Sequence, residues 1–182
     1  MKRFNREQIL EFLTEIDDHL DEPVAMEIIG GAAALLAYGA QSPTKDIDSF
    51  AGIDERIWKA AALASHRIPL DRTTVADPPY NYEDRRRPLD LNFHNLAIWV
   101  PEKHDLMLMK SLRAARHDEE VIQEMHLAEP FDLETIVERY NHEMDHAVGN
   151  HDIFDQKIQL IVEKLFGDKD ARRLGKAAKR LK

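Results

Sequence analysis

The sequence predicts a small mixed α/β fold, in which a short mixed β-sheet with flanking helices is followed by a helical C-terminal part. Apolar residues recur at helical spacing near the N-terminus and through the C-terminal half. Short apolar or alternating segments, bounded by turn residues, are typical of strands and lie mainly in the first 100 residues. Helices and strands that alternate before a run of helices indicate a small sheet followed by a helical half.

Apolar spacing decides between helix and strand for each segment. Ile9, Leu13 and Ile16 fall on one helical face, whereas the run VAMEII at residues 24–29 is short and apolar enough for a buried strand. The expected strands are residues 24–29, 46–50, 70–76 and 96–100. The expected helices are residues 6–20, 32–38, 54–66, 105–116, 119–126, 132–146 and 152–166. Residues 77–88, which hold three prolines and a charge cluster, are expected to form a long loop.

Composition limits the class of protein. The 182 residues suit one domain with a small appendage, and we expect a domain over residues 1–126 and a helical extension over residues 127–182. Without cysteines, disulfides and thiolate metal sites are excluded, and a cytoplasmic location is the default. No apolar run approaches the roughly 20 residues of a membrane helix.

Charge is distributed unevenly along the chain. The net charge is −9, but residues 169–182 alone carry +6 and leave −15 on the rest. An acidic body argues against broad binding of duplex DNA. The basic tail is interpreted as a solvated helix end, with contact to RNA or a nucleotide partner as the alternative.

Residues 27–50 carry the most chemical information. A predicted strand delivers Gly30 and Gly31 to the start of a helix, where a phosphate can approach the backbone closely and the helix N-terminus favours an anion. The chain returns as a strand in which Asp46 and Asp48 alternate with Ile47, so both carboxylates share one face about 7 Å apart. Carboxylates together with substrate phosphates are the ligands that Mg²⁺ prefers. The pattern therefore predicts an Mg²⁺ site beside a nucleotide triphosphate.

This ordered set resembles the polymerase β-like nucleotidyltransferase superfamily, whose signature is an apolar segment, Gly-Gly or Gly-Ser, and an Asp-x-Asp strand. More narrowly, Gly-Gly followed by Thr-Lys-Asp-Ile-Asp at residues 44–48 is similar to uncharacterised bacterial nucleotidyltransferase-like proteins related to AbiEii-type toxins. Further matching pieces are Tyr-Glu-Asp-Arg at residues 82–85, the strand at 96–100 and the helix from residue 105. The resemblance covers residues 27–125.

The resemblance implies a nucleotidyltransferase-like domain over residues 1–126. Its reaction would move a nucleotidyl group from a nucleoside triphosphate (NTP) to a hydroxyl or phosphate of an RNA, a protein or a small molecule. A link to toxin–antitoxin systems follows from the resemblance alone. The implied residues are Asp46 and Asp48 for Mg²⁺, Gly30, Gly31 and Thr44 at the triphosphate, and Lys110 and Arg116 for phosphate or acceptor contacts.

A third carboxylate usually completes the metal site of such enzymes. Asp90 has the expected local pattern, apolar-Asp-apolar, and is included among the predicted catalytic residues, while Asp71 and Asp77 lie nearer the strand expected from the element order. In the resembled enzymes the second residue of the glycine pair is often Ser, and Gly31 has no hydroxyl. The alternative function is therefore a nucleotide-binding or interaction module on the same fold, without catalysis.

A competing motif lies in the C-terminal half. His142, Glu143 and His146 match H-E-x-x-H, which on a helix places two histidines one turn apart to bind Zn²⁺, with the glutamate as general base. Asp145 puts a charge inside the motif, and the segment lies near a helix end. The main interpretation is a polar helix end, and a zinc hydrolase is the lesser alternative.

Overall fold

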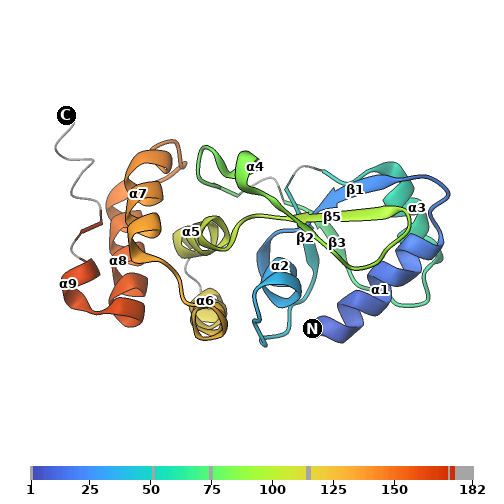
Figure 1. The fold of residues 1–182 in the computed structure, drawn as a ribbon, viewed down its shortest axis with the longest axis horizontal. Coiled ribbons are helices and arrows are strands. Elements are labelled where there is room, and N and C mark those ends of the chain that lie inside the picture. The colour runs from blue at the N-terminus through green and yellow to red at the C-terminus, as the bar shows by residue number, and fades with distance from the viewer. Residues whose placement is uncertain (1, 51, 74–75, 114–115, 172, 175–182) are drawn as a thin grey trace. The chain divides into compact units, whose positions relative to one another are not determined.

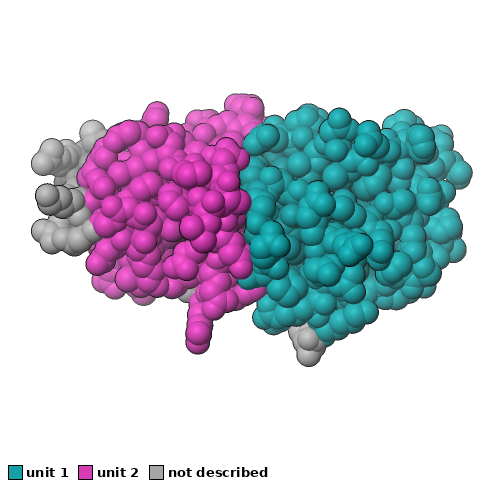
Figure 2. Space-filling view, turned by 60° about the horizontal axis from the view of Figure 1, so that its bottom comes forward, with its two compact units in different colours: residues 1–75, 86–101 teal, residues 76–85, 102–182 magenta. Residues whose placement is uncertain are grey.

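The computed structural model describes residues 2–50, 52–73, 76–113, 116–171 and 173–174 (Figure 1). Packing divides the chain into two compact units, residues 1–75 with 86–101 and residues 76–85 with 102–182 (Figure 2). This division follows contacts and does not test the predicted functional boundary after residue 126, which stays a prediction. Most of the basic tail at residues 169–182 lies outside the described residues.

The first unit holds every strand of the described chain. Its helices are α1 (Arg6–Asp18), α2 (Gly30–Ala37) and α3 (Glu55–Leu63), and its strands are β1 (Val24–Glu27), β2 (Ile47–Ser49), β3 (Leu70–Arg72), β4 (Arg87–Leu89) and β5 (Leu96–Val100). Helix α1 begins with a capping box between Asn5 and Gln8 and buries Phe12 and Leu13. It packs against α2 and α3. Asp54 is the N-cap of α3, and its side chain accepts the Arg56 N–H.

The strands form two small groups that an isolated bridge joins. β1 pairs in parallel with β5, β5 pairs antiparallel with β4, and β2 pairs in parallel with β3. After β1, the Ile28 N–H donates to the Trp99 carbonyl at 2.8 Å, whereas the Ile29 N–H donates to the Asp48 carbonyl at 2.9 Å. The end of β1 therefore lies between β5 and β2, and it brings the start of α2 to the face of β2 (Figure 1).

Residues 77–88 do not form the single long loop that the sequence predicts. They contain a short helix, α4 (Tyr82–Arg85), and the beginning of β4. The segment Arg-Pro-Leu of β4 does not alternate between apolar and polar residues, so periodicity does not detect it. Because β4 is the edge strand of its group, Pro88 is tolerated there without losing an essential ladder hydrogen bond.

The second unit is helical over its described residues. It contains α4 and five further helices, α5 (Lys103–Arg113), α6 (Arg116–Ala128), α7 (Leu133–Glu143), α8 (His151–Phe166) and α9 (Asp168–Ala171). Helix α5 packs on α6, α7 and α8, and buries Leu106, Met107 and Leu108 completely. No helix within the described part of the chain is both long and apolar enough to cross a membrane. The predicted fold class, a small mixed sheet with flanking helices and a helical C-terminal part, is confirmed.

Candidate functional site

Two carboxylates alternate with buried residues at β2: Asp46 directly precedes the strand and Asp48 lies within it. Ile47 and Ser49 are fully buried, while Asp46 and Asp48, at the alternate positions, are half-buried. This alternation follows from the two-residue period of a strand, in which successive side chains point to opposite faces. The burial pattern around Ile47 agrees with this alternation, and the role of Asp46 and Asp48 in binding a metal stays a prediction.

Gly30 lies directly against the Asp48 carboxylate. The bridge between Ile29 and Asp48 aligns the two segments, and Gly30 follows as the first residue of α2 with a φ of 67°. A Cβ atom at this position would stand 2.7 Å from Oδ2 of Asp48. Both the left-handed backbone and this close approach require glycine. The structure thus places the start of α2 and the Asp48 carboxylate together.

Gly31 makes a similar approach to Thr44. A Cβ on Gly31 would stand 2.7 Å from the Thr44 hydroxyl oxygen. Thr44 is buried, with its backbone held by two hydrogen bonds to Phe4, of 2.7 and 3.0 Å. Its Oγ1 lies 3.5 Å from Oδ1 of Asp46. A hydroxyl therefore stands beside the glycine pair, although the pair itself carries none.

The structure distinguishes the three acids proposed for the third position. Asp71 on β3 is in register with Asp48, so the two side chains lie on the same face of neighbouring parallel strands. Asp77 belongs to the other compact unit, where it accepts the Val148 N–H at 3.4 Å. Asp90 follows β4, which runs antiparallel to β5, so it lies toward the beginning of β5 and β1 and not beside Gly30. Asp71, rather than Asp90, is the acid next to Asp48.

Thr73 is a site residue that the sequence analysis did not identify. Its hydroxyl donates to Oδ1 of Asp48 at 3.1 Å, and its N–H donates to the Ser49 carbonyl at 2.9 Å. The signal was present in the sequence, because Asp71 and Thr73 are two residues apart and share a strand face.

Lys110 and Arg116, predicted to contact phosphate or acceptor, have contrasting surroundings in the second unit. The Lys110 side chain is 3% exposed, and its ammonium donates to Asp118 at 2.9 Å. Burial raises the pKa of Asp118, but hydrogen bonds and charges from Arg113 and Lys110 outweigh this and hold it below its usual value. The Arg116 side chain is 95% exposed and lies 3.4 Å from Glu120. Their roles in nucleotide binding stay predictions.

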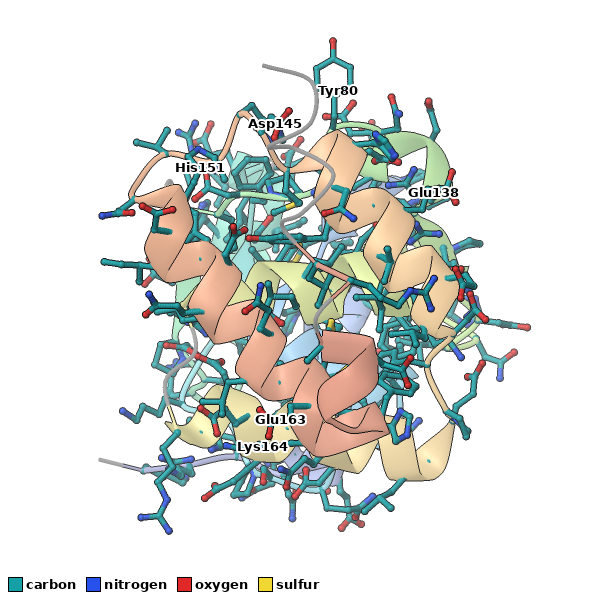
Figure 3. The ribbon with its side chains drawn as sticks, turned by 90° about the vertical axis from the view of Figure 1, so that its left-hand side faces the viewer. Tyr80, Glu138, Asp145, His151, Glu163 and Lys164 are labelled. Carbon is teal, nitrogen blue, oxygen red and sulfur yellow. The ribbon has the colours of Figure 1, made fainter. Side chains whose placement is uncertain are left out.

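The H-E-x-x-H segment does not form the helix that zinc binding requires. Helix α7 ends at Glu143, so His142 is helical and His146 is not; Asp145, labelled in Figure 3, lies in the connection to α8. The Glu143 carboxylate contacts Arg85 at 2.7 Å and accepts the Asn81 N–H. The expected helix over residues 132–146 is therefore too long by one turn. The polar helix end is the interpretation that the geometry supports.

The donor set at β2 suits a cation that also binds substrate. Among the described residues, no three His, Asp or Glu side chains gather closely enough to hold a metal ion by themselves. Two half-buried carboxylates beside a helix start instead match the way Mg²⁺ is usually held, by one or two carboxylates together with substrate phosphates. The residues present therefore fit such an ion in company with a nucleotide.

Comparison with known proteins agrees with this geometry. A family model described as a nucleotidyltransferase of unknown function (DUF6036) matches residues 5–165, which is most of the chain. Searches of curated proteins and of solved structures returned no significant match. The matched range includes the glycine pair, Asp46, Asp48 and Asp71. The narrower resemblance to AbiEii-type toxins stays a prediction. The chain belongs to the family of nucleotidyltransferases of unknown function, DUF6036.

Proposed function

We propose that this chain is an Mg²⁺-dependent nucleotidyltransferase, which moves a nucleotidyl group from an NTP to a hydroxyl or phosphate acceptor. The observation that carries the proposal is the contact between the start of α2 and the Asp48 carboxylate. A Cβ at Gly30 would stand 2.7 Å from Oδ2 of Asp48, so an anion at the helix start would lie beside the acidic face of β2. A cation there would be shared by carboxylates and phosphates.

Each residue has a definite part in this reaction. Gly30 and Gly31 let the triphosphate approach the backbone, and the Thr44 hydroxyl beside them is a hydrogen-bond donor for a phosphate oxygen. Asp46 and Asp48 would hold Mg²⁺, which when bound stabilises charge on the attacking and leaving oxygens. The acceptor oxygen forms a bond to the α-phosphorus as the bond to the bridging oxygen breaks, and pyrophosphate leaves. Asp71 is the nearby carboxylate that would take the acceptor proton.

The class of acceptor is proposed on charge. The chain outside its basic tail carries −15, which disfavours a long polyanion spread over the surface. A protein or small-molecule hydroxyl, or the end of an RNA held by the tail, fits this charge. A toxin–antitoxin role is proposed from the sequence resemblance alone.

A second candidate is a nucleotide-binding module without turnover. It is favoured by Gly31, because position 31 offers no hydroxyl of its own to the phosphates. Under this alternative the same face would bind Mg²⁺ and NTP but would release no pyrophosphate.

The test is calorimetric titration of the four NTPs with Mg²⁺ into the wild-type chain and the Asp46→Asn/Asp48→Asn variant, with Asp90→Asn as a matched control. Mg²⁺-dependent binding that is lost in the double variant and kept in Asp90→Asn supports the site. Pyrophosphate release with a candidate acceptor then supports the enzyme, and binding without release supports the second candidate. Well-folded wild-type protein that binds no NTP would refute both.

A further inference from the structure

The two oxygens of the Asp48 carboxylate have different surroundings. Oδ1 accepts a hydrogen bond from the Thr73 hydroxyl at 3.1 Å. Oδ2 faces Gly30 at the start of α2, where a Cβ would approach it to 2.7 Å. The carboxylate is thus turned so that one oxygen is directed to β3 and the other to the place where a phosphate would approach.

Thr73 is held in position to impose this orientation. Its N–H donates to the Ser49 carbonyl at 2.9 Å, which continues the β2–β3 ladder one residue beyond β3. The parallel register pairs Asp48 with Asp71, and strand alternation places Thr73 on the same face as Asp71. The β-branched threonine side chain has few χ1 rotamers, so its hydroxyl loses little freedom when it donates.

We infer that Thr73 is a positioning residue, whose hydroxyl fixes Oδ1 of Asp48 and thereby directs Oδ2 toward the cation at the start of α2. This inference rests on the proposed function, because it assumes that Asp48 binds a cation. Residues that hydrogen-bond a metal ligand typically change metal affinity by about 10- to 100-fold when they are removed. The effect of Thr73 should therefore appear in binding of the cation itself, alone or together with an NTP, before any acceptor is added.

The experiment measures binding of Mn²⁺, as a paramagnetic substitute for Mg²⁺, to the full chain. Binding of Mn²⁺ alone is followed by electron paramagnetic resonance of the free ion, and binding together with a non-hydrolysable NTP by water-proton relaxation enhancement. The hydroxyl is removed in Thr73→Val and Thr73→Ala and kept in Thr73→Ser. Thr14→Val is the matched control, because the Thr14 hydroxyl donates to the Leu10 carbonyl within α1 and away from β2. Thermal unfolding of each variant confirms that it is folded.

We expect Mn²⁺ affinity to fall about 10-fold or more in both variants without the hydroxyl, and to stay near wild type in Thr73→Ser and Thr14→Val. Wild-type affinity in a folded Thr73→Val or Thr73→Ala chain would overturn the role of Thr73 and leave the proposed function intact. An equal loss in Thr73→Ser would also overturn it, since the methyl group rather than the hydroxyl would then be responsible. If the wild type binds no Mn²⁺ either alone or with the NTP, the cation site of the proposed function fails and Thr73 has nothing to position.

Discussion

Replacement of Gly30 by alanine tests the contact on which the site depends. The φ of 67° costs a residue with a side chain about 1–2 kcal/mol. The new Cβ would stand 2.7 Å from Oδ2 of Asp48, whereas ordinary contact begins at 3.4 Å, so the carboxylate or the helix must move by about 0.7 Å. A displacement approaching 1 Å at a reacting group can lower the rate about 100-fold. We expect a lower midpoint of thermal unfolding and at least a 10-fold loss of Mg²⁺–NTP affinity.

Gly39 supplies a closely matched control. It is exposed and has a φ of 69°, so Gly39→Ala introduces the same backbone strain outside the candidate site. For a chain of this size, 1–2 kcal/mol corresponds to about 2–8 °C in the unfolding midpoint. Gly39→Ala should show this shift with unchanged nucleotide affinity. Gly30→Ala should unfold at a lower temperature still, and Asp48→Ala added to it should recover part of the stability.

The reasoning fails if Gly30→Ala is no less stable than Gly39→Ala and binds Mg²⁺–NTP as the wild type does. Calorimetric titration and thermal unfolding on the same protein samples decide this. If the double-mutant cycle gives an interaction energy near zero between positions 30 and 48, the Asp48 carboxylate does not contact the new methyl group, and the reasoning likewise fails.

Three further predictions concern other parts of the chain. Lys110→Met removes one partner of the buried Asp118 and should destabilise the protein by about 3 kcal/mol in urea unfolding, whereas Arg116→Ala, at an exposed pair, should change stability by less than about 0.5 kcal/mol. Burial raises the pKa of Glu102, but hydrogen bonds and charges from His104 and Arg139 outweigh it and lower this pKa from 4.5 to about 2. The contribution of Glu102 to stability is therefore complete above pH 4.5 and is lost as the pH falls toward 2. Glu102→Gln should weaken this part of the acid dependence in pH-dependent unfolding; an unaltered acid profile would count against it. Asp71→Asn should lower turnover by about 100-fold or more without unfolding the chain, while Asp90→Asn should leave turnover unchanged.

Local patterns predicted the features that depend on neighbouring residues in the sequence. Alternation alone placed Asp46 and Asp48 opposite Ile47, and the glycine pair marked the start of α2. The end of α7 could not be predicted in this way, because Glu143 is engaged by Tyr80, Asn81 and Arg85 from a distant segment. The choice among the three candidate acids depended in the same way on strand register, which periodicity does not supply.

The buried partner of Lys110 shows a different limit. The resemblance assigns Lys110 to phosphate or acceptor contacts and names no partner for it within the chain. In the structure its ammonium is buried against Asp118 on the next helix. Lysine is rarely buried unless its charge is paired. A single sequence does not show which acidic residue the partner is. Periodicity therefore predicted the helix that carries Lys110 but not the ion pair that its side chain forms.

The close approach of Gly31 to Thr44 explains why the hydroxyl beside the proposed phosphate position lies on another segment. A side chain at position 31 would begin 2.7 Å from the Thr44 oxygen, so a serine at 31 and a threonine at 44 compete for the same space. Thr44 is fixed by its backbone pairing with Phe4 and cannot withdraw without breaking that bridge. Glycine at 31 is therefore the residue that lets Thr44 keep its place, and the same hydroxyl lies beside Asp46. The absence of serine from the glycine pair thus argues for a relocated hydroxyl at this site, and a Thr44→Val variant with normal NTP affinity would contradict that argument.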